Sequence, residues 1–117
     1  MKLILSLLLM FGMFVGGATS ASAEKALAMD DYGAWGFEYG RTQEAARRQA
    51  FSTCSYYGAS CNTSVAEGNN WYFSGVTCAN HSYVGASPKG YWRSREIAFW
   101  KAWNNGDWDC YVTVDRY

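Results

Sequence analysis

The chain has 117 residues, and its ten basic and ten acidic side chains give a formal net charge of zero at pH 7. This length suits a single domain, and the balanced charge argues against a nucleic-acid-binding protein, which would carry a basic excess. The single histidine excludes a metal site with several histidine ligands, and we expect neither a metal nor a cofactor.

The first 23 residues have the layout of a secretory signal peptide. Lys2 gives a positive start, Leu3–Val15 forms an apolar run, and Ala21-Ser22-Ala23 supplies the small residues that precede a cleavage site. The apolar run of 13 residues is too short to cross a bilayer, which takes about 20 residues. We therefore expect cleavage between Ala23 and Glu24, a location in the periplasm or outside the cell, and no membrane span in the processed protein.

Residues 24–117 are expected to form one exported α+β domain made of two similar halves, about 26–66 and about 74–117. Loss of Lys2 would change the net charge of the processed chain to −1. All four cysteines would remain, and an even number of cysteines in a small exported domain indicates disulfides. A zinc site built from the four cysteines is the alternative, but the chain lacks the CxxC spacing typical of such sites.

The first half is predicted to contain two strands, a helix and a third strand. Thr42 can cap the helix, because its side-chain oxygen can accept a hydrogen bond from a free backbone N–H. Glu44 would lie in the first turn, where the helix dipole favours negative charge, and Gly58 would stop the helix. The predicted ranges are Ala26–Met29 and Ala34–Tyr39 for the strands, Thr42 to about Ser55 for the helix, and Cys61 onward for the third strand.

The second half is predicted to contain the same kinds of element. Ser94 would cap its helix, Glu96 would lie in the first turn, and Asn104-Asn105-Gly106 would end the helix. The predicted ranges are Trp71–Ser74 and Val76–Ala79 for the strands, Ser94 to about Asn104 for the helix, and Cys110 onward for the last strand.

An internal repeat accounts for this similarity. Tyr39–Ala46 aligns with Tyr91–Ala98 at a constant offset of 52, and Cys61–Val65 aligns with Cys110–Val114 at an offset of 49. Two copies are too few for a solenoid. We therefore expect a compact pseudo-symmetric domain, in which two strand-helix-strand repeats form an antiparallel sheet with both helices on one face.

The four cysteines allow three disulfide pairings. Cys54 lies near the end of the first predicted helix and Cys61 begins the next strand, so a bridge between them would fix the connecting loop. Cys54 has no counterpart in the second copy, which leaves Cys78 to pair with Cys110. We expect these two disulfides, and each can contribute about 2–4 kcal/mol to stability.

Aromatic side chains are concentrated in the second half. In the first helix Arg48 points to solvent, whereas its aligned counterpart in the second helix is Trp100. An exposed indole beside other apolar groups would be a contact surface, unless loops or the end of the chain cover it. The candidate binding residues are Tyr72, Trp92, Phe99, Trp100 and Trp103.

His81 is the only side chain that can act as an imidazole base. A triad of a serine, His81 and Asp30 or Asp31 could be drawn, but no serine lies in the glycine pattern of a nucleophile elbow. Disulfide-bonded cysteines offer no free thiol. The carboxylates of Asp30-Asp31 and Asp107-Trp108-Asp109 lie beside turn residues, where aspartate commonly caps the turn. We therefore assign no catalytic residue.

Several short segments are typical of a known family. They lie within residues 26–117 and comprise Gly33-Ala34-Trp35-Gly36, Glu44-Ala45-Ala46, Ala50, Cys54, Cys61 and Cys78. In these features the chain resembles the bacterial exported family of unknown function numbered four-one-eight-nine. The resemblance implies export and disulfides and brings no established activity. The second half departs from the pattern, because its helix carries Phe99, Trp100 and Trp103 where alanines are expected.

These features favour a small exported binding module that is not an enzyme. Its partner would be another envelope or secreted protein, as it is for an inhibitor or an immunity protein. A cell-wall glycan is the other candidate partner. The alternative is a small cell-envelope hydrolase that uses His81 with an aspartate.

Overall fold

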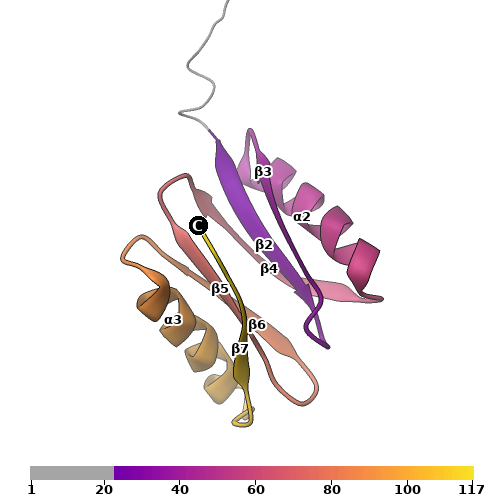
Figure 1. The fold of residues 1–117 in the computed structure, drawn as a ribbon, viewed down its shortest axis with the longest axis vertical. Helices are drawn as coiled ribbons and strands as arrows, with labels where there is room; N and C mark the ends of the chain where they lie inside the picture. Colours follow the sequence, from indigo (N-terminus) through magenta and orange to yellow (C-terminus); the bar gives the residue numbers. More distant parts are fainter. Residues whose placement is uncertain (1–22) are drawn as a thin grey trace, which may run out of the picture.

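The structure, a computed structural model, describes residues 23–117. The predicted signal peptide, apart from Ala23, therefore lies outside the described residues. Two antiparallel sheets of three strands each and two helices form the fold (Figure 1). The elements are β2 (Glu24–Asp30), β3 (Trp35–Gly40), α2 (Gln43–Tyr57), β4 (Cys61–Gly68), β5 (Tyr72–Thr77), β6 (Ser82–Ser87), α3 (Tyr91–Asn104) and β7 (Tyr111–Arg116).

Each half of the chain contributes one sheet and one helix. In the first half β2 lies between β3 and β4, and in the second half β5 lies between β6 and β7. Every paired strand is antiparallel, and Leu27 in the middle of β2 lies opposite both Phe37 and Val65. The expected α+β class is confirmed, and the two halves have the same topology of strand, strand, helix and strand.

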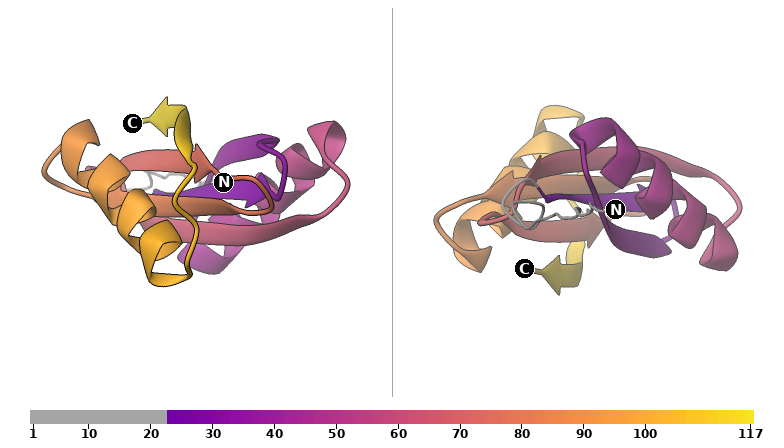
Figure 2. Two further views of the ribbon diagram at one scale, coloured as in Figure 1. Left: turned by 90° about the horizontal axis from the view of Figure 1, so that it is seen from below. Right: turned by 90° about the horizontal axis from the view of Figure 1, so that it is seen from above.

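The arrangement of the strands differs from the predicted one, which was a single sheet with both helices on one face. The two sheets pack face to face, because Leu27 and Met29 of β2 form one core cluster with Phe73 of β5 and Val84 of β6. The helices α2 and α3 lie on opposite sides of the strands (Figures 1 and 2). The fold therefore has four layers, with a helix outside each sheet.

The sequence of β2 explains this layering. Successive side chains of a strand point to opposite faces, and in β2 small and large apolar residues alternate. Ala26 and Ala28 face α2, where they pack with Ala46 and Ala50, while the larger residues between them face the second sheet. Because both faces of β2 are apolar and buried, one helix and one sheet are needed to cover them.

Helix α3 begins earlier than predicted. Its N-cap is Gly90, whose φ of 141° is accessible mainly to glycine, and Glu96 consequently lies beyond the first turn. Ser94 does not cap the helix: it is fully buried, and its hydroxyl lies 2.6 Å from the hydroxyl of Ser74. The prediction was wrong because a hydroxyl that forms a hydrogen bond in the core was interpreted as a cap. Thr42, in contrast, caps α2 as predicted.

The corrected start of α3 changes the alignment of the two helices. Each helix buries three small residues, which lie 4, 8 and 12 positions after its N-cap. The two helices therefore align at an offset of 48, the distance between Thr42 and Gly90, and not at 52. The buried residues are Ala46, Ala50 and Cys54 in α2 and Ser94, Ala98 and Ala102 in α3.

The strands of the second half also differ from the prediction. The segments predicted over 71–74 and 76–79 overlap one continuous strand, β5, which ends at Thr77. The strand β6 was not predicted, because its sequence, Ser-Tyr-Val-Gly-Ala-Ser, is poor in the β-branched and aromatic residues that favour strands.

Two glycines allow close approach between layers. In β6, a Cβ atom on Gly85 would overlap the backbone oxygen of Ser94, so this glycine lets α3 lie directly on its sheet. In β5, a Cβ atom on Gly75 would overlap the sulfur of Met29, so this glycine receives the methionine side chain from the opposite sheet. Packing at each of these two layer boundaries therefore depends on a missing side chain.

Both expected disulfides are present. Cys54 pairs with Cys61 and Cys78 pairs with Cys110. Both lie near the end of the molecule where the β2–β3 and β5–β6 turns meet, since Cys61 lies opposite Asp30 in the sheet and the Cys78 N–H donates to the His81 carbonyl. The disulfides thus anchor the loops at this end, which we call the hairpin end.

Candidate functional site

Two surfaces hold the residues that the sequence singled out. The first lies on α3, which turns its small residues toward the sheet and leaves tryptophans outside. Trp92, Trp100 and Trp103 are 63%, 57% and 41% exposed, and Trp108 in the following loop is 72% exposed. Phe99 is half-buried beside them. We call these five residues the aromatic face.

Ring stacking orders part of the aromatic face. The ring centroids of Phe99 and Trp103 are 5.8 Å apart, and those of Trp103 and Trp108 are 5.9 Å apart, with interplanar angles of 28° and 15°. Such aromatic pairs are worth about 0.5–1.5 kcal/mol beyond the area that they bury. The stack therefore holds the loop after α3 against the helix, and its rings lose little further freedom when a partner binds.

Basic side chains flank Trp100. A hollow of about 330 Å³ is lined by Arg93, Ile97, Trp100 and Lys101. Arg93 forms an ion pair with Glu96 at 2.5 Å, and the Lys101 ammonium donates to the Val84 carbonyl at 2.7 Å. Burial lowers the pKa of Lys101. The hollow thus combines two apolar side chains, those of Ile97 and Trp100, with the cationic side chains of Arg93 and Lys101.

Tyr72 belongs to a different cluster. Its ring stacks on Tyr117 at 4.3 Å and meets the edge of Tyr91 at 5.0 Å between centroids. The Lys25 ammonium lies 4.4 Å from the centroid of the Tyr117 ring. The structure therefore brings four of the five candidate binding residues together on α3 and places Tyr72 in a half-buried cluster beside the last residue of the chain.

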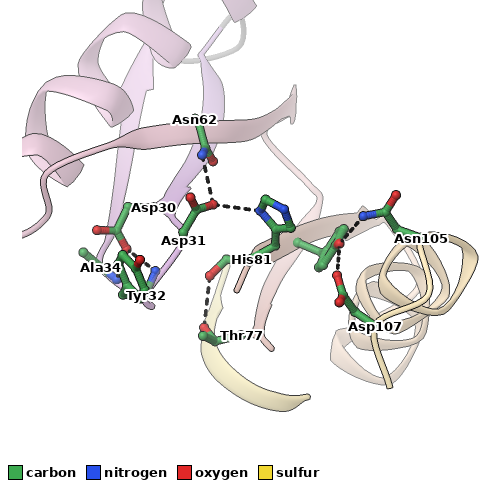
Figure 3. Close-up of polar contacts among 11 residues, drawn as sticks. Asp30, Asp31, Tyr32, Ala34, Asn62, Thr77, His81, Asn105 and Asp107 are labelled. Carbon is green, nitrogen blue, oxygen red and sulfur yellow. Dashed lines mark hydrogen bonds and ion pairs between the residues drawn. The ribbon is translucent and has the colours of Figure 1, made fainter. Parts of the chain in front are cut away.

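The second surface is polar and lies at the hairpin end. His81 Nδ1 lies 3.0 Å from Asp31 Oδ1, and the side-chain amide of Asn62 donates to the same oxygen at 2.9 Å (Figure 3). These hydrogen bonds from Asn62 and His81 lower the pKa of Asp31. Asp30 does not join them, because its carboxylate accepts hydrogen bonds from the backbone N–H groups of Tyr32 and Ala34 and so caps its own turn.

A second hydrogen-bonded group continues this surface. The Tyr83 hydroxyl donates to the Asp107 carboxylate and accepts a hydrogen bond of 2.8 Å from the Asn105 amide. Burial, together with the bond to Asp107, raises the pKa of Tyr83. Between the two groups lies a shallow groove of about 370 Å³, which we call the hairpin-end groove. It is lined by Asn62, Thr63, His81, Ser82, Tyr83 and Asn105.

Three residues of this surface were not predicted from the sequence, namely Asn62, Tyr83 and Asn105, although one signal was present. Residues two apart in a strand point to the same face, so a strand prediction that covered β6 would have placed Tyr83 on the same side as His81. Asn62 and Asn105 had no such local signal.

In the hairpin-end groove the candidate base is His81, and no nucleophilic side chain, whether serine, threonine or cysteine, is hydrogen-bonded to it among residues 23–117. The Ser82 hydroxyl is bonded to Thr77 instead, at 3.2 Å, and all four cysteines are in disulfides. Within the same residues, no three metal-ligating side chains gather at one point.

Comparisons of the chain with protein-family models, with curated proteins and with solved structures gave no match. The resemblance to the family numbered four-one-eight-nine therefore stays a prediction. In the part of the chain that the structure describes, neither helix is long and apolar enough to cross a membrane.

Proposed function

We propose that the protein is a small exported binding module, not an enzyme, whose aromatic face contacts another envelope or secreted protein. The observation that carries this proposal is the exposure of four tryptophans on one helix and the loop that follows it. Tryptophan and arginine are the residues most often responsible for affinity at protein interfaces, and Arg93 lies beside Trp100 here. An inhibitor or immunity protein is one instance of such a module.

The first half of the chain serves as an internal reference for what the fold requires. At the offset of 48 between the helices, Phe99 corresponds to Phe51, and both are half-buried. The three exposed tryptophans of α3, in contrast, correspond to polar residues of α2. Since α2 packs on its sheet without them, packing alone does not account for the tryptophans. The corresponding residues of α2, in chain order, are Glu44, Ser52 and Ser55.

Export is part of the same proposal. The two disulfides fit an oxidising compartment, and the signal-peptide pattern of the first residues fits cleavage near Ala23–Glu24 and a periplasmic or extracellular location. Membership of the family numbered four-one-eight-nine would agree with both. Mass spectrometry of the intact, unreduced protein tests cleavage and disulfide formation together.

The test of the binding function exchanges residues between the two helices. A variant with Trp92→Glu, Trp100→Ser and Trp103→Ser carries the residues that α2 has at the same positions, so it is expected to fold. Tyr56→Ser with Tyr57→Ser is the matched control, because it removes aromatic rings that are 88% and 75% exposed on α2.

Proteins captured from an envelope fraction are identified and purified. The affinity of each purified protein for each variant is then measured. We expect the tryptophan variant to bind the purified partner at least about 30-fold more weakly, as for the loss of an interface hot spot, while the tyrosine control binds normally. A folded tryptophan variant that binds its partner as tightly as the unmodified protein would contradict the proposal.

A small hydrolase is the second candidate, and the 3.0 Å contact between His81 and Asp31 favours it. The carboxylate can orient the imidazole, which would then take a proton from an attacking water molecule. An activity on cell-wall substrates that disappears in a His81→Ala variant would support the hydrolase and exclude the purely binding function.

A further inference from the structure

The hairpin-end groove is a second built surface, distinct from the aromatic face. Its side chains come from both halves of the chain: Asn62 from β4, His81 from the β5–β6 turn, Tyr83 from β6 and Asn105 from the end of α3. Figure 3 shows Asn62 and His81 meeting at Asp31, with Asn105 and Asp107 on another segment beside them. The β2–β3 and β5–β6 turns occupy equivalent places in the two repeats, yet one carries Asp31 and the other His81.

The groove is held in shape before any ligand binds. Asp31 fixes Asn62 and His81, and Asp107 fixes Tyr83. The disulfide between Cys78 and Cys110 joins the two loops that carry these groups, because Cys78 precedes the His81 turn and Cys110 follows Asp107. Side chains that are already ordered lose little rotamer freedom on binding, so even a shallow groove can bind a small ligand.

The lining groups define the chemistry of that ligand. Two amides, two aliphatic hydroxyls, a phenol and an imidazole line the groove. Several of these groups already form hydrogen bonds within the protein, and the donors and acceptors that they retain lie side by side, which matches adjacent hydroxyl groups on a ring. The carboxylates of Asp31 and Asp107 stand behind these groups, and Coulomb repulsion from them disfavours an anionic ligand.

An exposed indole follows in sequence one of the groups that hold the groove. Trp108 directly follows Asp107, and its indole is 72% exposed while it stacks on Trp103. A sugar ring has an apolar face of C–H groups, and the face of an indole can cover it. The indole does not line the groove itself, and the polar groups alone define the site.

From these observations we infer that the hairpin-end groove binds a neutral saccharide of one or two rings. This site is independent of the protein-binding role of the aromatic face, because none of the residues that line the groove belongs to that face.

The inference is tested by NMR titration of the oxidised, isotope-labelled protein. The probes are three neutral disaccharides, namely N,N′-diacetylchitobiose, cellobiose and maltose, and one anionic disaccharide, digalacturonate. We expect at least one neutral disaccharide to shift the backbone amides of Asn62, His81 and Tyr83, and digalacturonate to bind at least about tenfold more weakly.

Two single variants, Asn62→Ala and Asn105→Ala, remove exposed amides and leave the core intact. Each is expected to weaken binding by about tenfold, as for the loss of one hydrogen bond to the ligand. Glu44→Gln on α2 is the control and should bind normally. The inference is overturned if no neutral disaccharide shifts the groove amides, if digalacturonate binds as tightly, or if the shifts fall only on the aromatic face.

Discussion

The two disulfides close loops of different length, and this difference predicts unequal contributions to stability. Cys54 and Cys61 are 7 residues apart, while Cys78 and Cys110 are 32 apart. In the chain-entropy treatment a cross-link stabilises the fold by restricting the unfolded chain, more so for a longer loop. At 25 °C the two loops give about 2.4 and about 3.7 kcal/mol.

The perturbation is removal of one disulfide at a time, in the double variants Cys54→Ala/Cys61→Ala and Cys78→Ala/Cys110→Ala. The comparison is balanced in burial, because each disulfide joins one buried and one half-buried cysteine. For a domain of this size the difference of about 1.3 kcal/mol corresponds to about 7 °C in melting temperature. The variant without Cys78–Cys110 should melt lower.

Circular dichroism or calorimetry under non-reducing conditions measures both melting temperatures against the unmodified protein. Reduction of the unmodified protein provides the control, since it should lower the melting temperature more than either double variant does. If the variant without Cys54–Cys61 melts at the same temperature as the other or lower, loop length does not set the contribution of these disulfides and the reasoning fails.

Three further predictions concern packing, exposure and charge. Gly85→Ala should lower the free energy of unfolding by about 1–3 kcal/mol, because the added Cβ would overlap the backbone of Ser94. Urea denaturation measures this loss, and an unchanged denaturation midpoint would contradict the prediction. Phe73→Ala, at a fully buried site, should lower the free energy of unfolding by about 3–5 kcal/mol. Trp100→Ser should lower it by less than about 1 kcal/mol. Equal losses in the two variants would show that Trp100 supports the core. Burial alone would raise the pKa of Asp115, but hydrogen bonds from Arg95 and Ser74 lower it. The stability that the Asp115 carboxylate contributes to the fold is therefore fully present above the unfolded-state pKa of about 3.9. It is lost as the pH falls through the lowered folded-state pKa. An Asp115→Asn variant should lack this part of the acid sensitivity in a pH series of melting curves, and an unchanged acid profile would refute it.

Local signals in the sequence were sufficient for the first helix, and comparison of the two halves was sufficient for the disulfides. The side chain of Thr42 accepts the hydrogen bond from Ala45 N–H that defines an N-cap, and Gly58 ends the helix. These signals work because a cap involves residues only three or four apart. The second helix carries a hydroxyl residue at Ser94 as well, but there the hydroxyl has a partner in the core, Ser74.

The packing of the two sheets could not be predicted in the same way. The alternation of small and large apolar residues in β2 was visible in the sequence, but nothing local indicates that the large residues meet another sheet. The hairpin-end groove has the same origin, because Asp31 contacts Asn62 and His81, which follow it by 31 and 50 residues. The first contact needs the pairing of β4 with β2 and the second needs the packing of the two halves, so an isolated sequence motif cannot reveal either.

The contact between Met29 and Gly75 has a chemical consequence. The Met29 side chain is fully buried, and the space that its sulfur fills exists only because residue 75 has no side chain. A thioether is open to oxidation in the same surroundings that favour disulfides, and the polar sulfoxide would have no suitable place between two apolar sheets. While the sheets stay together the sulfur is shielded from peroxide. The gain of one oxygen atom at Met29, about 16 Da in a peptide mass, would therefore record how often the two halves of the molecule separate.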